Sequence, residues 1–108
     1  LHNRRLFHEL LSEEVAQAAR YGRELSLGIV DLDGFKLIND TLGHRAGDRV
    51  LQGAAAALSA GVRRSDRVFR YGGEEFAILM PETGELAAAA ALDRVRRALA
   101  EQAISYGR

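Results

Sequence analysis

Apolar residues recur along the chain at spacings that predict alternating helices and strands. Near-helical spacing over residues 3–21 gives one apolar stripe, with Asn3 suited to the N-cap and Gly22 to a left-handed end. Residues 25–32 form a mostly apolar run of strand length. Both alternating faces of this run are apolar or small, which predicts a strand buried on both sides.

The remainder of the chain continues this alternation. Spacing and turn residues predict a helix over 35–42, a loop over 43–47, a helix from the N-cap Asp48 to about Gly61, strands over 67–71 and 75–80, and an Ala-rich helix over 85–101 with Arg94, Arg96 and Arg97 outward. The second of these strands is apolar on both faces, so we expect it to be central. Three strands with helices before and after them predict an α/β sandwich of the α+β type, with helices on one or both faces of the sheet.

Composition narrows the class of protein. With 108 residues the chain forms one domain at most, and its 47% hydrophobic and 28% charged content fits a globular protein. Fifteen basic and fifteen acidic residues cancel, which argues against a general nucleic-acid or anionic-membrane surface. The absence of Cys excludes disulfides, zinc thiolates and thiol catalysis. The apolar runs are too short for a transmembrane span.

The sequence around Gly72 and Gly73 predicts a β-hairpin. Two glycines between strand-like runs favour a two-residue turn, because such turns need positive φ, which glycine adopts without a steric penalty. This turn would pair the flanking residues as Tyr71 with Glu74, Arg70 with Glu75, and Phe69 with Phe76. The adjacent carboxylates of Glu74 and Glu75 add nothing to a turn, so their position at its tip suggests a cation.

Asp31 and Asp33 stand at the carboxyl end of the first predicted strand, where ligands bind in open α/β sheets. An unpaired buried carboxylate is unfavourable, so these groups need a partner or a metal. Two neighbouring strands can bring Asp31 and Glu74 into one site, and oxygen ligands without His or Cys favour Mg²⁺ or Mn²⁺ over Zn²⁺. Turn formation by Asp-x-Asp-Gly is the alternative.

Two further segments carry candidate nucleotide contacts. Gly34, Phe35 and Lys36 lead into a helix, where free N–H groups and a cation can bind phosphate, although a solvated lysine is the alternative. Asn39 and Asp48 flank the predicted loop, and a carboxylate with an amide can read the edge of a guanine. Helix capping is the alternative for both residues.

Arg63 and Asp66 stand between the long helix and the hairpin, where an arginine can complement the helix dipole and an aspartate can start a turn. Together with the other segments they complete a resemblance. The segment Gly72–Phe76 resembles the signature of the GGDEF family, the diguanylate cyclases, in its Glu-containing variant. The other matching segments are Asn3–Phe7 for the family's first helix, Asp31–Asp40 for its metal and phosphate segment, Gly43–Asp48 for its guanine loop, and Arg63 with Asp66 for its RxxD motif.

The resemblance implies a nucleotidyl-cyclase fold, with a palm-like, mainly antiparallel central sheet and flanking helices. It implies condensation of two GTP into cyclic di-GMP and pyrophosphate, with Mg²⁺ or Mn²⁺ as cofactor. Because one domain holds one GTP, it also implies a catalytic homodimer. The implied setting is a cytoplasmic domain under a regulatory sensory domain of the parent chain, with no nucleic-acid partner and no direct membrane contact.

The resemblance also implies a role for each matching residue. Asp31 and Glu74 would bind the metals beside the carbonyl of Leu32, and Glu75 would assist the metals or help to deprotonate the attacking hydroxyl. The implied GTP contacts are Phe35 and Lys36 at the phosphates, Asn39 and Asp48 at the guanine, and Gly72 and Gly73 as further GTP-binding residues. Arg63 and Asp66 would form an inhibitory site for the product.

Members of the family extend past both ends of this sequence. By the resemblance, a further central strand, a hairpin and a final helix with a phosphate-binding Lys and Arg follow Arg108, and the family's first segment is shortened to Leu1. We therefore expect the parent protein to be an active cyclase and the 108-residue chain to be weak or inactive. The missing strand is also expected to leave an open sheet edge that invites pairing between copies.

Two other classes of function fit part of the sequence. A non-catalytic module would use the same fold to bind GTP or cyclic di-GMP, but degenerate relatives usually lose the hairpin carboxylates, and Glu74 and Glu75 are both present. A phosphohydrolase of the haloacid dehalogenase type would use Asp31–Gly34 as its nucleophile motif. Phe35 replaces the Thr of that motif, and the hairpin would be left without a role.

Overall fold

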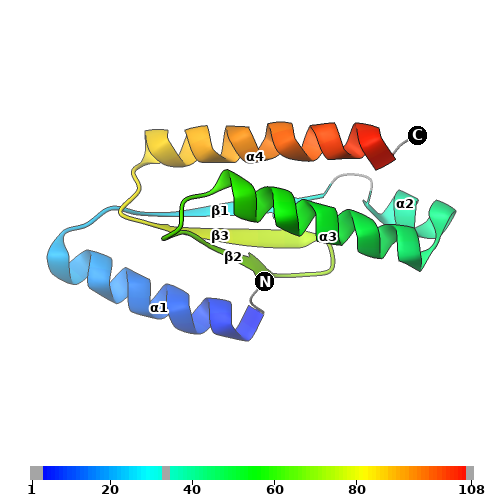
Figure 1. The fold of residues 1–108 in the computed structure, drawn as a ribbon. Coiled ribbons are helices and arrows are strands. Elements are labelled where there is room, and N and C mark those ends of the chain that lie inside the picture. Colours follow the sequence, from blue (N-terminus) through cyan, green and yellow to red (C-terminus); the bar gives the residue numbers. More distant parts are fainter. Residues whose placement is uncertain (1–3, 33–34, 107–108) are drawn as a thin grey trace.

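The computed structural model describes residues 4–32 and 35–106, with side chains as far as residue 100. Its elements are, in order, α1 (Arg4–Tyr21), β1 (Leu25–Asp31), α2 (Phe35–Leu42), α3 (His44–Gly61), β2 (Arg67–Arg70), β3 (Glu75–Pro81) and α4 (Glu85–Tyr106). Helices α3 and α4 cover one face of a three-stranded sheet and α1 covers the other, which confirms the expected α+β sandwich (Figure 1). The predicted N-cap Asn3 and the candidate residues Asp33 and Gly34 lie outside the described residues.

The central strand of the sheet is β3, as its apolar sequence predicts. The strand order is β1-β3-β2, and both pairings are antiparallel. Residues 76–80 are all buried because alternate side chains enter two separate cores. Phe76, Ile78 and Met80 pack with α3 and α4, whereas the two residues between them pack with α1.

Strand β1 lies at an edge of the sheet, and the prediction that it is buried on both sides is wrong. Leu27 and Ile29 expose 43% and 57% of their surface. Gly28, between them, is buried against Leu92 of α4. Both cores are centred on β3, so α1 reaches only the beginning of β1, where Leu25 packs against its core.

Replacing Ile29 by Lys is expected to weaken self-association of the chain about tenfold, which is the ~1.4 kcal/mol that one apolar side chain contributes to such a contact. An edge strand with exposed apolar side chains can pair with a second copy, and a lysine there opposes the pairing. Light scattering over a concentration series measures the effect. Leu86→Lys is the control, because Leu86 is 88% exposed but belongs to α4 and not to the edge strand. A chain that stays monomeric at every concentration would contradict this expectation.

The hairpin between β2 and β3 pairs one residue away from the predicted register. Arg70 lies opposite Phe76, and the Tyr71 N–H donates to the Glu75 carbonyl at 2.9 Å. The loop therefore holds three residues, 72–74, and neither of its glycines has a positive φ. The predicted two-residue turn, with its three cross-strand pairs, is wrong.

The shifted register separates the two aromatic residues that the sequence pattern places opposite each other. A shift of one residue moves a side chain to the other face of the sheet, so Phe69 and Phe76 enter different cores. Phe69 packs against Phe7 of α1 with ring centroids 5.1 Å apart, and Tyr71 packs against Phe7 at 5.5 Å. The hairpin is therefore attached to α1 by aromatic contacts.

Helix α3 begins at His44, earlier than predicted. Its N-cap is Gly43, which has a φ of 90° and makes no side-chain hydrogen bond. A glycine tolerates this φ, which allows a sharp turn between α2 and α3. Asp48 therefore lies inside the helix, where its side chain is exposed, and its predicted N-cap role is wrong.

The ends of the first and last helices show how closely the sequence pattern locates boundaries. Gly22, with a φ of 63°, ends α1 as predicted, and α4 continues past the predicted end at residue 101.

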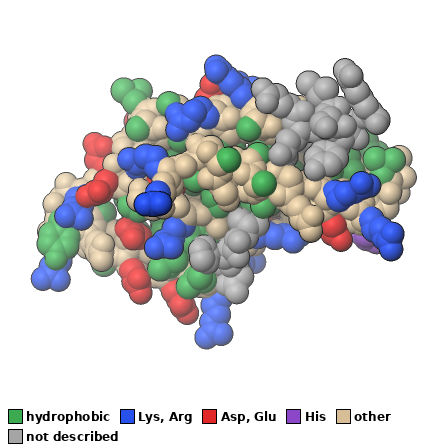
Figure 2. Space-filling model, viewed as in Figure 1, with side chains coloured by type: hydrophobic (Ala, Val, Ile, Leu, Met, Phe, Trp, Pro, Cys, Tyr) green, Lys and Arg blue, Asp and Glu red, His purple; other side chains and the backbone are tan. Residues whose placement is uncertain are grey.

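None of the helices in the described ranges combines sufficient length and apolarity to span a membrane. Basic and acidic side chains both lie among apolar ones on the face seen in Figure 2.

Candidate functional site

The end of β1 and the tip of the hairpin lie side by side. Asp31, the last residue of β1, is directly opposite Glu75, the first residue of β3. The Leu32 N–H donates to the Glu74 carbonyl at 3.0 Å, which extends the pairing to the hairpin tip. The structure thus brings together two pairs of neighbouring residues, 31–32 and 74–75, that are far apart in the sequence and that the family resemblance assigns to one metal site.

The charges at this strand end are unbalanced. Directly opposite residues of an antiparallel pair share a face, so Asp31 and Glu75 project to the same side of the sheet. Both side chains are exposed, and neither has an ion-pair partner among the described residues. Like charges in this arrangement repel, and a cation between the strands would offset the repulsion.

The donor atoms at the strand end suit a hard divalent cation. Mg²⁺ is usually bound by one or two protein carboxylates and keeps its other positions for water and substrate phosphates. Besides the carboxylates, the Leu32 carbonyl accepts the Phe35 N–H at 3.3 Å and keeps a second lone pair. Within residues 4–32 and 35–100, no three His, Cys, Asp or Glu side chains converge on one point. A cation here would therefore depend on substrate phosphates for part of its coordination.

Arg70 organises the hairpin tip, a role that the sequence analysis misses. Its guanidinium donates to the Gly73 carbonyl at 2.9 Å and to the Gly72 carbonyl at 3.3 Å, instead of pairing with Glu75. A Cβ at Gly72 would lie 3.0 Å from Oε1 of Glu75, so a larger residue there would require the Glu75 carboxylate to shift. Only the correct hairpin register could reveal either contact in advance.

The predicted phosphate segment borders the strand end. Helix α2 begins at Phe35, which is partly buried, and Lys36 is exposed on the first turn. Phe35 lines a cavity of about 530 Å³ together with Asp31 and Leu32. The start of α2 and the end of β1 therefore share one cavity.

Arg96 of α4 also lines this cavity, although the sequence pattern places it outward with its neighbours. Among the described residues that line the cavity, which are mostly apolar, Asp31 and Arg96 carry charges. Arg96 donates to Asp93 at 2.9 Å, and Arg97 pairs with the same carboxylate at 2.9 Å. The Arg96 hydrogen bond, with the charge of Arg97, lowers the pKa of Asp93. No sequence signal separates Arg96 from the other exposed arginines of α4.

Asn39 and Asp48 come from α2 and α3, which pack against each other. Gly47, beside Asp48, is buried, and a Cβ at Gly47 would collide with Oδ1 of Asn39. The glycine therefore permits the close approach of the two helices that places Asn39 next to the turn of α3 carrying Asp48. The sequence pattern predicts only a loop at Gly47 and gives no sign of this contact. Because Asp48 caps no helix, its exposed carboxylate is available to a ligand.

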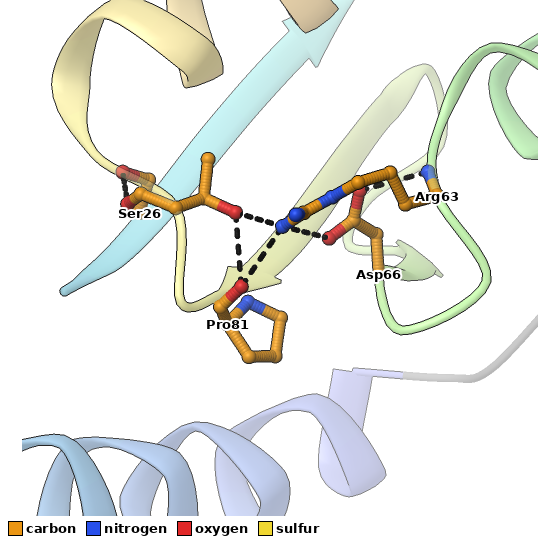
Figure 3. A network of polar contacts seen from close by, with 5 residues as sticks. Ser26, Arg63, Asp66 and Pro81 are labelled. Carbon is orange, nitrogen blue, oxygen red and sulfur yellow. Dashed lines mark hydrogen bonds and ion pairs between the residues drawn. The ribbon is translucent and has the colours of Figure 1, made fainter. Parts of the chain in front are cut away.

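Arg63 and Asp66 form the turn between α3 and β2 (Figure 3). The Asp66 carboxylate accepts the Arg63 N–H at 2.9 Å, and the Asp66 N–H donates to the Arg63 carbonyl at 3.0 Å. The Asp66 side chain is 2% exposed, and within the described part of the chain its Oδ1 has no hydrogen-bond partner. The Arg63 side chain, by contrast, is 53% exposed. It contacts Pro81, so this turn lies at the opposite end of β3 from the hairpin tip.

Comparison with known proteins extends these observations. The family model of the diguanylate cyclase GGDEF domain matches residues 1–108. Diguanylate cyclase DgcP of Pseudomonas aeruginosa is 45% identical over 100 residues, which cover 93% of this chain and 15% of that protein.

Solved structures show the same similarity. The GGDEF domain of DgcB from Caulobacter crescentus, in complex with c-di-GMP, has a TM-score of 0.85 and 35% identity, over 89% of this chain and 56% of that one. The active GGEEF domain of a diguanylate cyclase from Vibrio cholerae has a TM-score of 0.86 and 35% identity, over 90% of this chain and 62% of that one. The chain thus spans less than two thirds of each of these relatives. With a family match over its whole length, the chain belongs to the GGDEF family of diguanylate cyclase domains.

Proposed function

We propose that this cytoplasmic domain, as a homodimer under a sensory domain of its parent chain, condenses two GTP into cyclic di-GMP and two pyrophosphates. One observation carries the proposal: Asp31 lies opposite Glu75, and Leu32 is hydrogen-bonded to Glu74 at the hairpin tip. The Vibrio cholerae relative, described as an active GGEEF domain, supports it. The whole-chain family match argues against the phosphohydrolase alternative.

The chemistry consists of two nucleotidyl transfers. In each, the 3′-hydroxyl oxygen of one GTP attacks the α-phosphorus of the other, and a new P–O bond forms. The bond from that phosphorus to the α–β bridging oxygen breaks, and pyrophosphate leaves with the bonding electrons. The hydroxyl proton passes to a base, for which Glu75, an exposed carboxylate at the strand end, is the candidate. Each domain contributes one nucleotide, so two domains must meet.

The residues of the strand end would hold a divalent cation and the phosphates. Asp31 and Glu74 would bind Mg²⁺ or Mn²⁺ through their carboxylates, with the Leu32 carbonyl beside them. Such an ion, when bound, would neutralise phosphate charge and favour departure of pyrophosphate. The exposed ammonium of Lys36 and the N–H groups at the start of α2, where Phe35 stands, would orient the phosphates. Gly72 and Gly73 keep the hairpin tip free of side chains where GTP would approach.

Asn39 and Asp48 would select guanine. The Watson–Crick edge of guanine presents two N–H donors that one carboxylate can accept, whereas adenine presents a different pattern of donors and acceptors. The exposed carboxylate of Asp48 suits these donors, and the amide of Asn39 can complete the contact. A site built this way discriminates against adenine because its polar groups would be left unpaired.

Arg63 and Asp66 would form the inhibitory site for cyclic di-GMP. A half-exposed guanidinium can donate to a phosphate oxygen or to the acceptor edge of a guanine. The DgcB relative, described in complex with c-di-GMP, supports this assignment. The turn lies at the far end of β3 from the hairpin tip, so inhibition there would act away from the proposed catalytic site.

Product analysis of the parent protein tests the proposal. Incubation with GTP and Mg²⁺ should yield cyclic di-GMP and pyrophosphate in a 1:2 ratio by mass spectrometry and pyrophosphate assay, and ATP should yield neither. Arg63→Ala should relieve inhibition by added product. Calorimetric binding of GTP or cyclic di-GMP without turnover would favour the non-catalytic module. Phosphate release that is independent of GTP and lost in Asp31→Asn would favour the phosphohydrolase.

A further inference from the structure

The turn that carries Arg63 is in contact with the turn that follows β3. Nη2 of Arg63 donates to the Pro81 carbonyl at 3.0 Å and also to the Thr83 hydroxyl (Figure 3). The Thr83 hydroxyl donates to the same Pro81 carbonyl at 2.9 Å. The guanidinium nitrogen, the hydroxyl and the carbonyl therefore form a closed triangle of hydrogen bonds.

This triangle holds the guanidinium of Arg63 by one of its three nitrogens. Nη2 has two hydrogens, and its two acceptors use both of them. Nε and Nη1 make no hydrogen bond to the side chains and backbone described within residues 4–32 and 35–100, and half of the side chain is exposed. Nε and Nη1 therefore remain as donors for a ligand.

Thr83 is itself fixed in place. It is only 4% exposed, and its carbonyl accepts the Ser26 hydroxyl of β1 at 2.7 Å. Because the Thr83 hydroxyl donates its hydrogen to the Pro81 carbonyl, its oxygen lone pairs can accept from Arg63. Asp66 holds the backbone N–H of the arginine and forms an ion pair with Nη2 at 3.6 Å, whereas the Thr83 hydroxyl makes a direct hydrogen bond to Nη2.

We propose that Thr83 is a positioning residue for Arg63, and that it presets the guanidinium for cyclic di-GMP before the ligand arrives. Thr83 has this role only if Arg63 contacts cyclic di-GMP, as the proposed function states. Ordering a long side chain on binding costs conformational entropy, so an arginine that is already held binds its ligand more tightly. Nε and Nη1 supply donors for a phosphodiester oxygen or a guanine edge.

Calorimetric titration of the purified protein with cyclic di-GMP tests this role. Thr83→Val, which keeps the shape and removes the hydroxyl, should weaken binding about three- to tenfold, the range expected when one long side chain must be ordered on binding. Thr83→Ser, which keeps the hydroxyl, should bind within about twofold of the unsubstituted protein. Ser26→Ala removes the hydrogen bond that holds the Thr83 carbonyl but leaves the hydroxyl contact to Arg63, so it should weaken binding less than Thr83→Val does.

Side-chain ¹⁵N NMR of the ligand-free, unsubstituted protein gives a second measurement that does not depend on a variant folding. The Nη resonances of Arg63 should be separate, as for a guanidinium whose rotation is hindered, and rapid averaging would overturn the role. If Thr83→Val binds cyclic di-GMP as tightly as the unsubstituted protein, or more tightly, the positioning role of Thr83 is overturned. If Arg63→Ala abolishes binding in the same experiment, the proposed inhibitory site still stands. No binding by the unsubstituted protein would overturn the proposed inhibitory site and the role of Thr83 together.

Discussion

Glu74→Gln is expected to lower the rate of cyclic di-GMP formation about 10²- to 10³-fold. The amide keeps the shape of the side chain but removes a charge that would hold the cation at the strand end. Charge stabilisation by such an ion contributes several kcal/mol to the transition state, and each ~1.4 kcal/mol is a factor of ten in rate. The measurement is the initial rate of product formation at saturating GTP and Mg²⁺, and Asp31→Asn should show a loss of the same order.

Two further variants test whether the loss of rate in Glu74→Gln is specific to the cation site. Glu85→Gln removes an exposed carboxylate at the start of α4, away from the site, and should leave the rate unchanged. Glu75→Gln should lower the rate of product formation less than Glu74→Gln does. It should also be at least as stable to heat as the unsubstituted protein, because it removes one of two like charges that face each other. If Glu75→Gln lowers the rate strongly and Glu74→Gln lowers it little, then Glu75 is the metal ligand and Glu74 the assisting residue. Glu75 could take that role because it lies directly opposite Asp31.

Asp48→Asn is expected to lower kcat/KM for GTP about 10- to 100-fold, because a paired base contact contributes roughly 1–3 kcal/mol of discrimination. The replacement turns an acceptor of two guanine N–H groups into a group with one acceptor and one donor end. The preference for GTP over ATP should narrow by the same factor. Competition between the two nucleotides in the product assay measures both quantities.

Two further variants separate guanine recognition from general damage to the α2–α3 pair. Asp40→Asn changes an exposed carboxylate of α2 and should leave the preference for GTP unchanged. Gly47→Ala alters no charge, but its Cβ would displace the Asn39 amide, so it should weaken GTP binding as well. An unchanged preference for GTP in Asp48→Asn would remove Asp48 from guanine recognition.

The sequence predicts the order of the seven elements and the neighbourhood of Asp31 and the hairpin, because both depend on strong local signals. An apolar run of strand length, a Gly-Gly pair and an apolar second strand are enough to predict that β3 is central. These local signals do not determine the register of the hairpin. Paired glycines favour a two-residue turn, whereas Arg70, bonded to two loop carbonyls, accompanies a three-residue loop.

Long-range packing decides the other differences. Nothing in the apolar run of β1 shows that α1 reaches only its beginning, so the exposure of Leu27 and Ile29 could not be predicted locally. Likewise, an aspartate after a glycine-rich segment is typical of an N-cap, but Gly43 takes that place. This difference strengthens the case for a ligand at Asp48, because its competing structural role is absent.

Thr83 and Arg96 show a further limit of sequence reasoning. The hydroxyl of Thr83 meets Arg63 only because the turn after β3 lies beside the turn before β2, a contact between segments far apart in the sequence. Arg96 borders the cavity only because α4 crosses the face of the sheet near the end of β1. Both contacts follow from the tertiary fold.

The central claim is that the end of β1 and the hairpin tip form one cation site. Its most direct test is the affinity of the domain for Mn²⁺, measured by electron paramagnetic resonance in the presence of a non-hydrolysable GTP analogue. Asp31→Asn and Glu74→Gln should each weaken Mn²⁺ binding at least about tenfold, while Asp40→Asn should not. Mn²⁺ binding that is unchanged in both Asp31→Asn and Glu74→Gln would contradict this claim.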